Sequence, residues 1–134
     1  MNKSQNSESL SKESIRQLVS LLNQGKPLKV LELSKNLIDQ NPESFILWNL
    51  IGAANNALGK TNKAVKAFEK VTKLNPNYPD GFNNLGATLR EQGKLKAAEK
   101  ACTRAIFLNP NYAIAHYNLG NTFKDQNKLK QATE

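Results

Sequence analysis

Apolar residues recur along this chain in pairs of short helical series. Between residues 79 and 112 the first series falls at i, i+3, i+4 and i+7, which is one face of a helix. It comprises Phe82, Leu85, Gly86 and Leu89. Gly93 then interrupts the pattern, because glycine lets the backbone leave a helix. A second series runs from Leu95 to Ile106, and Asn109-Pro110 ends it because proline cannot continue a helix. The segment therefore predicts a helix, a tight turn, a second helix and another tight turn.

This pattern repeats at an interval of 34 residues. The tetrapeptide Asn-Pro-Asn-Tyr closes the segment at 109–112 and also stands at 75–78. Aligning the chain with itself at this interval gives units 11–44, 45–78, 79–112 and 113–134, after a polar and flexible lead-in over 1–10. The first unit keeps few of the apolar positions. We therefore predict one degenerate helical hairpin, two regular ones, and a last unit truncated in its second helix.

Small residues mark where the two helices of each unit should approach closely. Glycine inside a helix costs about 1 kcal/mol relative to alanine, and close packing against the partner helix would offset that cost. The glycines are Gly52, Gly86 and Gly120, and the matching alanines on the second helices are Ala64, Ala98 and Ala132.

These positions resemble the tetratricopeptide repeat, a 34-residue helix–turn–helix with the pattern W-x₂-L-G-x₂-Y, then A-x₃-F, then P. One unit fills it with Trp48, Ile51, Gly52, Ala64, Phe68 and Pro76, and the next with Phe82, Leu85, Gly86, Leu89, Ala98, Cys102 and Pro110. His116, Leu119, Gly120, Phe123 and Ala132 begin a third. The resemblance covers residues 11–134. It implies an all-α fold, a right-handed α-solenoid whose first helices line a concave groove that binds extended segments of other proteins.

The predicted partner-binding residues lie on the face of the first helices that is not used for packing. They are Asn49, Asn83, Asn84, Tyr117, Asn118 and Asn121. A carboxamide both donates and accepts hydrogen bonds, so it can pair with a peptide backbone whatever the side chains are. The set resembles the asparagine ladder in the repeats of O-linked N-acetylglucosamine transferase. In the present chain Asn84 and Asn118 occupy the ladder position, and Leu50 occupies it in the preceding unit and interrupts the ladder. The alternative is that these asparagines are ordinary polar residues on a solvated helix face.

A carboxylate clamp, as in chaperone-binding relatives, needs lysine and arginine at inward positions to bind a terminal carboxylate. The equivalent positions hold Ile15, Val19, Asn84, Ile114 and Asn118. Only Asn84 matches that pattern, so we do not expect a standard clamp.

Charge and chemistry change this picture little. The net charge of +8 favours anionic partners, and lysines cluster on the second helices. That face lacks stacking aromatics, since Phe68 belongs to the packing stripe, so we expect a solvated face rather than a nucleic-acid site. Gly59-Lys60-Thr61 resembles the end of a phosphate-binding loop, but Ala54 stands where its first glycine should be. No cofactor or metal site is expected.

Single residues of special chemistry also have plain explanations. His116 takes the packing position of Trp48, and Cys102 takes that of Phe68 as a small apolar residue. A lone cysteine fits a reducing compartment, and no apolar run is long enough to span a membrane, so a cytoplasmic protein is expected. The repeats resemble bacterial arrays, which implies a bacterial source.

Two functions from different classes follow. The first is a protein-protein interaction module without enzyme activity, which binds an extended peptide or protein segment. The alternative is the N-terminal substrate-recruiting arm of a larger transferase, either an O-GlcNAc-transferase-like glycosyltransferase or a sulfotransferase, whose catalytic domain is not in this chain. A scaffold without chemistry is a third reading. Because nothing caps the last helix, we expect a fragment that frays or self-associates at that end.

Overall fold

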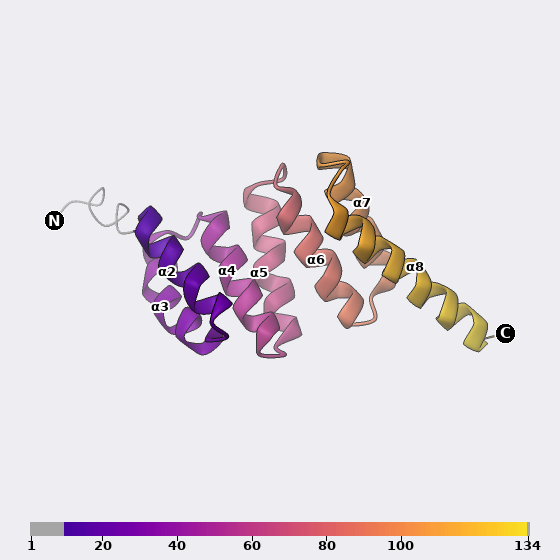
Figure 1. Ribbon diagram of the computed structural model, residues 1–134, viewed down its shortest axis with the longest axis horizontal. Helices are drawn as coiled ribbons and strands as arrows, with labels where there is room; N and C mark the ends of the chain where they lie inside the picture. Colours follow the sequence, from indigo (N-terminus) through magenta and orange to yellow (C-terminus); the bar gives the residue numbers. More distant parts are fainter. Residues whose placement is uncertain (1–9, 134) are drawn as a thin grey trace. The chain divides into compact units, whose positions relative to one another are not determined.

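The computed structural model describes residues 10–133, so most of the predicted flexible lead-in lies outside the described residues. Over these residues the chain forms seven α-helices and no strand. The helices are α2 (Lys12–Asn23), α3 (Pro27–Gln40), α4 (Phe45–Ala57), α5 (Thr61–Leu74), α6 (Pro79–Glu91), α7 (Leu95–Leu108) and α8 (Ala113–Thr133) (Figure 1). They belong to two compact units, residues 1–74 and residues 75–134.

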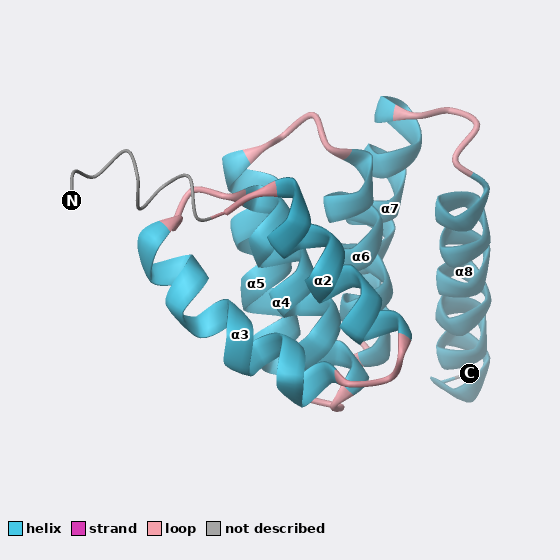
Figure 2. Cartoon of the chain, turned by 60° about the vertical axis from the view of Figure 1, so that its left-hand side comes forward, coloured by secondary structure: helices cyan, strands magenta, loops and turns pink. Residues whose placement is uncertain are grey.

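The first unit holds two helical hairpins, α2 with α3 and α4 with α5, joined by short loops (Figure 2). Their apolar faces bury Leu18, Val30 and Leu47, each almost fully removed from solvent. Serine side chains begin two of the helices: Ser11 Oγ accepts from the Ser14 amide at 3.1 Å, and Ser44 Oγ accepts from the Leu47 amide at 3.2 Å. Such caps satisfy amides that the first turn of a helix leaves without a partner.

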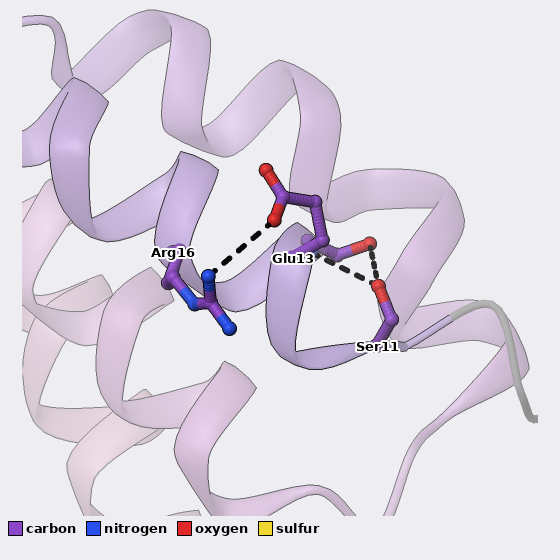
Figure 3. A network of polar contacts seen from close by, with 4 residues as sticks. Ser11, Glu13 and Arg16 are labelled. Carbon is purple, nitrogen blue, oxygen red and sulfur yellow. Dashed lines mark hydrogen bonds and ion pairs between the residues drawn. The ribbon is translucent and has the colours of Figure 1, made fainter.

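The start of α2 also carries a small polar network (Figure 3). Ser11 Oγ lies 3.2 Å from Ser14 Oγ, and Arg16 Nη1 lies 3.7 Å from Glu13 Oε2. Both charged side chains are largely exposed, so water screens this ion pair and its contribution to stability is small. The network defines where α2 begins rather than forming a binding site.

Glycine makes each tight turn inside a hairpin. Gly25, Gly59 and Gly93 have φ values of +72°, +74° and +77°, and no other described residue type has positive φ. L-residues with a Cβ avoid this left-handed region, so the turn positions read from the sequence are confirmed.

The second unit contains the hairpin of α6 and α7, followed by α8. A last unit truncated in its second helix was predicted, and this is wrong: α8 runs as one unbroken helix from Ala113 to Thr133 (Figure 1). The reason is local. Asn127 stands where the regular hairpins have Gly59 and Gly93, and no non-glycine residue here enters the left-handed conformation that the turn requires.

The close approach predicted at mid-helix glycines holds in two of three places. A Cβ added at Gly52 would lie 2.5 Å from Phe68 Cε1, and one added at Gly86 would lie 2.5 Å from Cys102 Sγ. At Gly120 nothing lies within 4 Å, and Ala132 is exposed. The packing prediction for Gly120 and Ala132 is therefore wrong, because α8 has no second helix folding back on it.

Candidate protein-binding surface

Two of the predicted partner-binding residues, one on α6 and one on α8, contact each other. Asn118 Nδ2 donates to Asn83 Oδ1 at 2.9 Å. Asn83 is only 3% exposed, and this bond gives its buried carboxamide oxygen a partner. Asn118 is half-buried and keeps one N–H and its carboxamide oxygen for another partner. Asn83 thus fixes the orientation of Asn118.

The other predicted residues of this unit lie around that pair. Asn84 and Asn121 are half-buried, whereas Tyr117 is 69% exposed. Two threonines hydrogen-bond the backbone of the same helices one turn earlier: Thr88 Oγ1 donates to the Asn84 carbonyl, and Thr122 Oγ1 donates to the Asn118 carbonyl, both at 2.8 Å. We call Asn83, Asn84, Tyr117, Asn118 and Asn121 the asparagine surface.

Asn49, the sixth predicted residue, lies on α4 in the first unit, where it is half-buried. A groove that Asn49 shares with the asparagine surface stays a prediction.

An ion pair joins the same two helices further along. Arg90 Nε on α6 lies 2.7 Å from Asp125 Oδ2 on α8, with about a third of each side chain exposed. The hydrogen bond from Arg90 lowers the pKa of the Asp125 carboxyl. Asn83 pairs with Asn118 and Arg90 with Asp125 across the same offset of 35 residues, so the two contacts set one register between α6 and α8.

The tyrosines of the two Asn-Pro-Asn-Tyr motifs share one acid. The Tyr78 and Tyr112 hydroxyls both interact with the carboxylate of Asp80, in the first turn of α6. Burial, followed by the charge and hydrogen bond of Asp80, raises the pKa of Tyr78 to about 12. Burial and the same carboxylate raise the pKa of Tyr112 further. The two tyrosines, one just before α6 and one just after α7, thus share Asp80 at the open end of the hairpin.

The cysteine has the packing role predicted for it, but the histidine does not, because the His116 side chain is exposed. His116 Nε2 lies 2.8 Å from the Pro110 carbonyl, and Trp48 Nε1 donates to the Pro42 carbonyl at the same distance. A carbonyl only accepts, so His116 Nε2 carries the hydrogen and imitates the indole. Cys102 is fully buried, and desolvation raises the pKa of its thiol.

One feature of α7 escaped sequence reasoning. Phe107 is 72% exposed, and the guanidinium of Arg104 lies 5.1 Å from its ring centroid and 5.9 Å from that of Phe82. The statement that the basic face lacks aromatics is therefore wrong for this helix. The available signal was Phe107 itself, an aromatic residue where the preceding unit has Lys73.

Over residues 10–133 no three or more His, Cys, Asp or Glu side chains gather as metal ligands would. None of the helices in that range is long and apolar enough to cross a membrane.

Helical hairpins joined by glycine turns, with small residues at the closest contacts, define an all-α repeat protein. Family comparison identifies which kind. A model described as "TPR repeat" matches residues 52–93, and one described as "Tetratricopeptide repeat" matches residues 79–112, the bounds of one predicted unit. Residues 52–112 thus match models of the tetratricopeptide repeat. Comparison by sequence with curated proteins found no match.

Solved structures confirm the all-α repeat fold at low identity. The Sgt2 TPR domain from Aspergillus fumigatus has a TM-score of 0.85 and 20% identity, covering 92% of this chain and 85% of its own. The first TPR of Spaghetti (RPAP3), bound to the HSP90 peptide SRMEEVD, has a TM-score of 0.79 and 22% identity, covering 83% and 88%. Thermobaculum terrenum O-GlcNAc transferase has a TM-score of 0.80 and 17% identity, covering 91% of this chain but only 23% of the transferase.

Proposed function

We propose that this chain is a protein-interaction module that holds an extended segment of another protein on the asparagine surface. The observation that carries the proposal is the Asn83–Asn118 pair. A buried amide holds Asn118 in place, and the exposed Tyr117 lies beside it on α8. A preorganised carboxamide loses little entropy on binding, and it can both donate to and accept from a peptide backbone.

The binding mode differs from that of a carboxylate clamp. The positions expected to carry its cations hold Val19, Ile114 and Asn118 among others, and the first two are exposed apolar residues. The Spaghetti domain binds an HSP90 peptide, and its likeness to this chain supports peptide binding as a class. Here backbone hydrogen bonds to amides would supply the affinity, with modest selectivity for the bound sequence.

The test uses peptides selected from a random 12-residue display library on the full chain. Tyr117→Ala and Asn121→Ala together remove an apolar contact and a hydrogen bond, each worth about 1 kcal/mol, so binding should weaken roughly 10- to 100-fold. The matched control is Phe123→Ala with Gln131→Ala, which alters exposed positions elsewhere on α8. Equal binding by both double variants for every selected peptide would refute the proposal.

Asn118→Ala is a second test with a different signature. It removes the hydrogen-bond donor of the buried Asn83 amide oxygen, and a buried acceptor left without a partner costs about 1–3 kcal/mol. Binding and melting temperature should therefore fall together for Asn118→Ala, whereas Tyr117→Ala and Asn121→Ala should leave the melting temperature unchanged.

The alternative function is the substrate-recruiting arm of a transferase. Its support is the likeness to the O-GlcNAc transferase, of which this chain covers under a quarter. Reading the gene beyond the codon for Glu134 tests it: a glycosyltransferase or sulfotransferase domain in frame would favour the arm, and further repeats followed by a stop codon would exclude it.

A further inference from the structure

A second surface of the same unit has the features of a docking site. Between α6 and α7 lies an open cavity of about 600 Å³. Leu85, Leu89 and Ala101 form its apolar lining, and Phe82 and Phe107 stand at its sides. We call this cavity the α6–α7 pocket. It is separate from the asparagine surface, which involves α6 and α8.

The pocket is positively charged and carries no acid. Lys100 and Arg104 line it, and no aspartate or glutamate does. Arg104 forms no ion pair with any described carboxylate. Instead its guanidinium lies over the rings of Phe82 and Phe107, which hold the charge in place. The N–H groups of Arg104 can still donate to a carboxylate.

Packing does not require this apolar character, as the preceding hairpin shows. Thirty-four residues earlier, the positions of Leu89, Ala97 and Phe107 hold Asn55, Lys63 and Lys73. The α4–α5 hairpin forms with these polar residues, so the fold tolerates them. Phe107 is thus an exposed aromatic residue that the fold does not require, and it lies beside the apolar lining of the pocket.

We propose that the α6–α7 pocket docks a short segment of a partner protein that presents an apolar side chain next to an aspartate or glutamate. The apolar side chain enters between Leu85, Leu89 and Phe107, and the carboxylate pairs with Arg104. A nucleic acid fits less well, because Arg104 already lies over the rings of Phe82 and Phe107, and the other apolar residues of the lining are aliphatic and offer no stacking platform.

The experiment uses the full chain and the peptides selected on it from the same 12-residue library. Phe107→Lys copies the residue of the preceding hairpin, and Phe123→Lys is the matched control at another exposed phenylalanine, 47% exposed on α8. One class of peptides should lose at least about tenfold in affinity to Phe107→Lys, keep it with Phe123→Lys, and contain an apolar residue beside an acid. Circular dichroism of each variant confirms that the helices are intact.

Charge reversal makes the test specific. Arg104→Glu should weaken the same peptides, and replacing their acid by lysine should restore part of the affinity for Arg104→Glu only. Three outcomes would overturn the proposal: no Phe107-dependent peptide is selected, the dependent peptides lack an acid, or a 12-nucleotide oligouridylate binds with a Phe107-dependent affinity while no peptide does. Peptides that depend on Tyr117 and Asn121 report on the other surface, so either proposal can fail alone.

Discussion

The contrast between Gly86 and Gly120 gives the sharpest test of how this chain packs. The two glycines lie 34 residues apart, at the same position of their units. In Gly86→Ala the new methyl would lie 2.5 Å from Cys102 Sγ, 3.2 Å from the Ala98 carbonyl oxygen and 3.3 Å from the Cys102 amide nitrogen. In Gly120→Ala it would meet nothing within 4 Å.

These distances fix the sign of each effect. Normal contact begins near 3.4 Å, so Gly86→Ala must displace backbone as well as the buried sulfur. Overpacking of this kind costs about 1–3 kcal/mol. Alanine regains about 1 kcal/mol of helix propensity at both sites. The net expectation is a loss of about 1–2 kcal/mol for Gly86→Ala and a gain of up to about 1 kcal/mol for Gly120→Ala.

Urea and thermal unfolding followed by circular dichroism measure both variants. At roughly 4 °C per kcal/mol for a chain of this size, Gly86→Ala should melt about 4–8 °C lower and Gly120→Ala up to about 4 °C higher. A double-mutant cycle with Cys102→Ala isolates the contact, because the alanine at 86 would then fill the space of the lost sulfur and cost less. A stable Gly86→Ala, or a destabilised Gly120→Ala, would refute the reasoning.

Three further predictions rest on single features. Gly93→Ala should lose about 1 kcal/mol in urea unfolding, because φ there is +77°. Because the pKa of Tyr78 is raised from 10.0 to about 12, the folded state keeps the tyrosine proton at a pH where the unfolded state has lost it. The free energy of unfolding should therefore fall as the pH rises from 10 to 12. Asp80→Asn should lower the pKa values of Tyr78 and Tyr112 in an absorbance titration. Asn127→Gly should reduce helical circular dichroism by breaking α8, and unchanged ellipticity would count against the account of that helix.

Local chemistry determined what could be predicted from the sequence. Glycine turns and Asn-Pro stops act on the backbone within a few residues, so the turn at Gly93 and the end of the second helix before Asn109 were predicted correctly. The second helix expected in the last unit does not form separately, because Asn127 stands where the regular hairpins have a glycine. Glycine adopts the left-handed backbone of these turns more readily than asparagine does, and at Asn127 the chain stays helical.

Contacts between helices were harder to foresee. The sequence marked Asn83 and Asn118 as two ligands of one partner, whereas the structure bonds them to each other. Their offset is 35 residues and the repeat is 34, because neighbouring helices in contact are shifted by one position. This one-residue difference depends on how the side chains of the two helices pack, so aligning the chain with itself at 34 residues does not predict it. Asp80, shared by two tyrosines, escaped notice for the same reason, since neither motif copy contains it.

Repetition itself separates structure from function in this chain. Positions that hold the hairpin together repeat, as Gly52 and Gly86 do, because every unit must solve the same packing problem. Binding needs chemistry at one place only, so its residues should depart from the repeat where the fold permits. Phe107 in place of Lys73 is such a departure: it is exposed and stacked on Arg104. Residues that break the repeat without serving the packing are therefore the first ones to mutate.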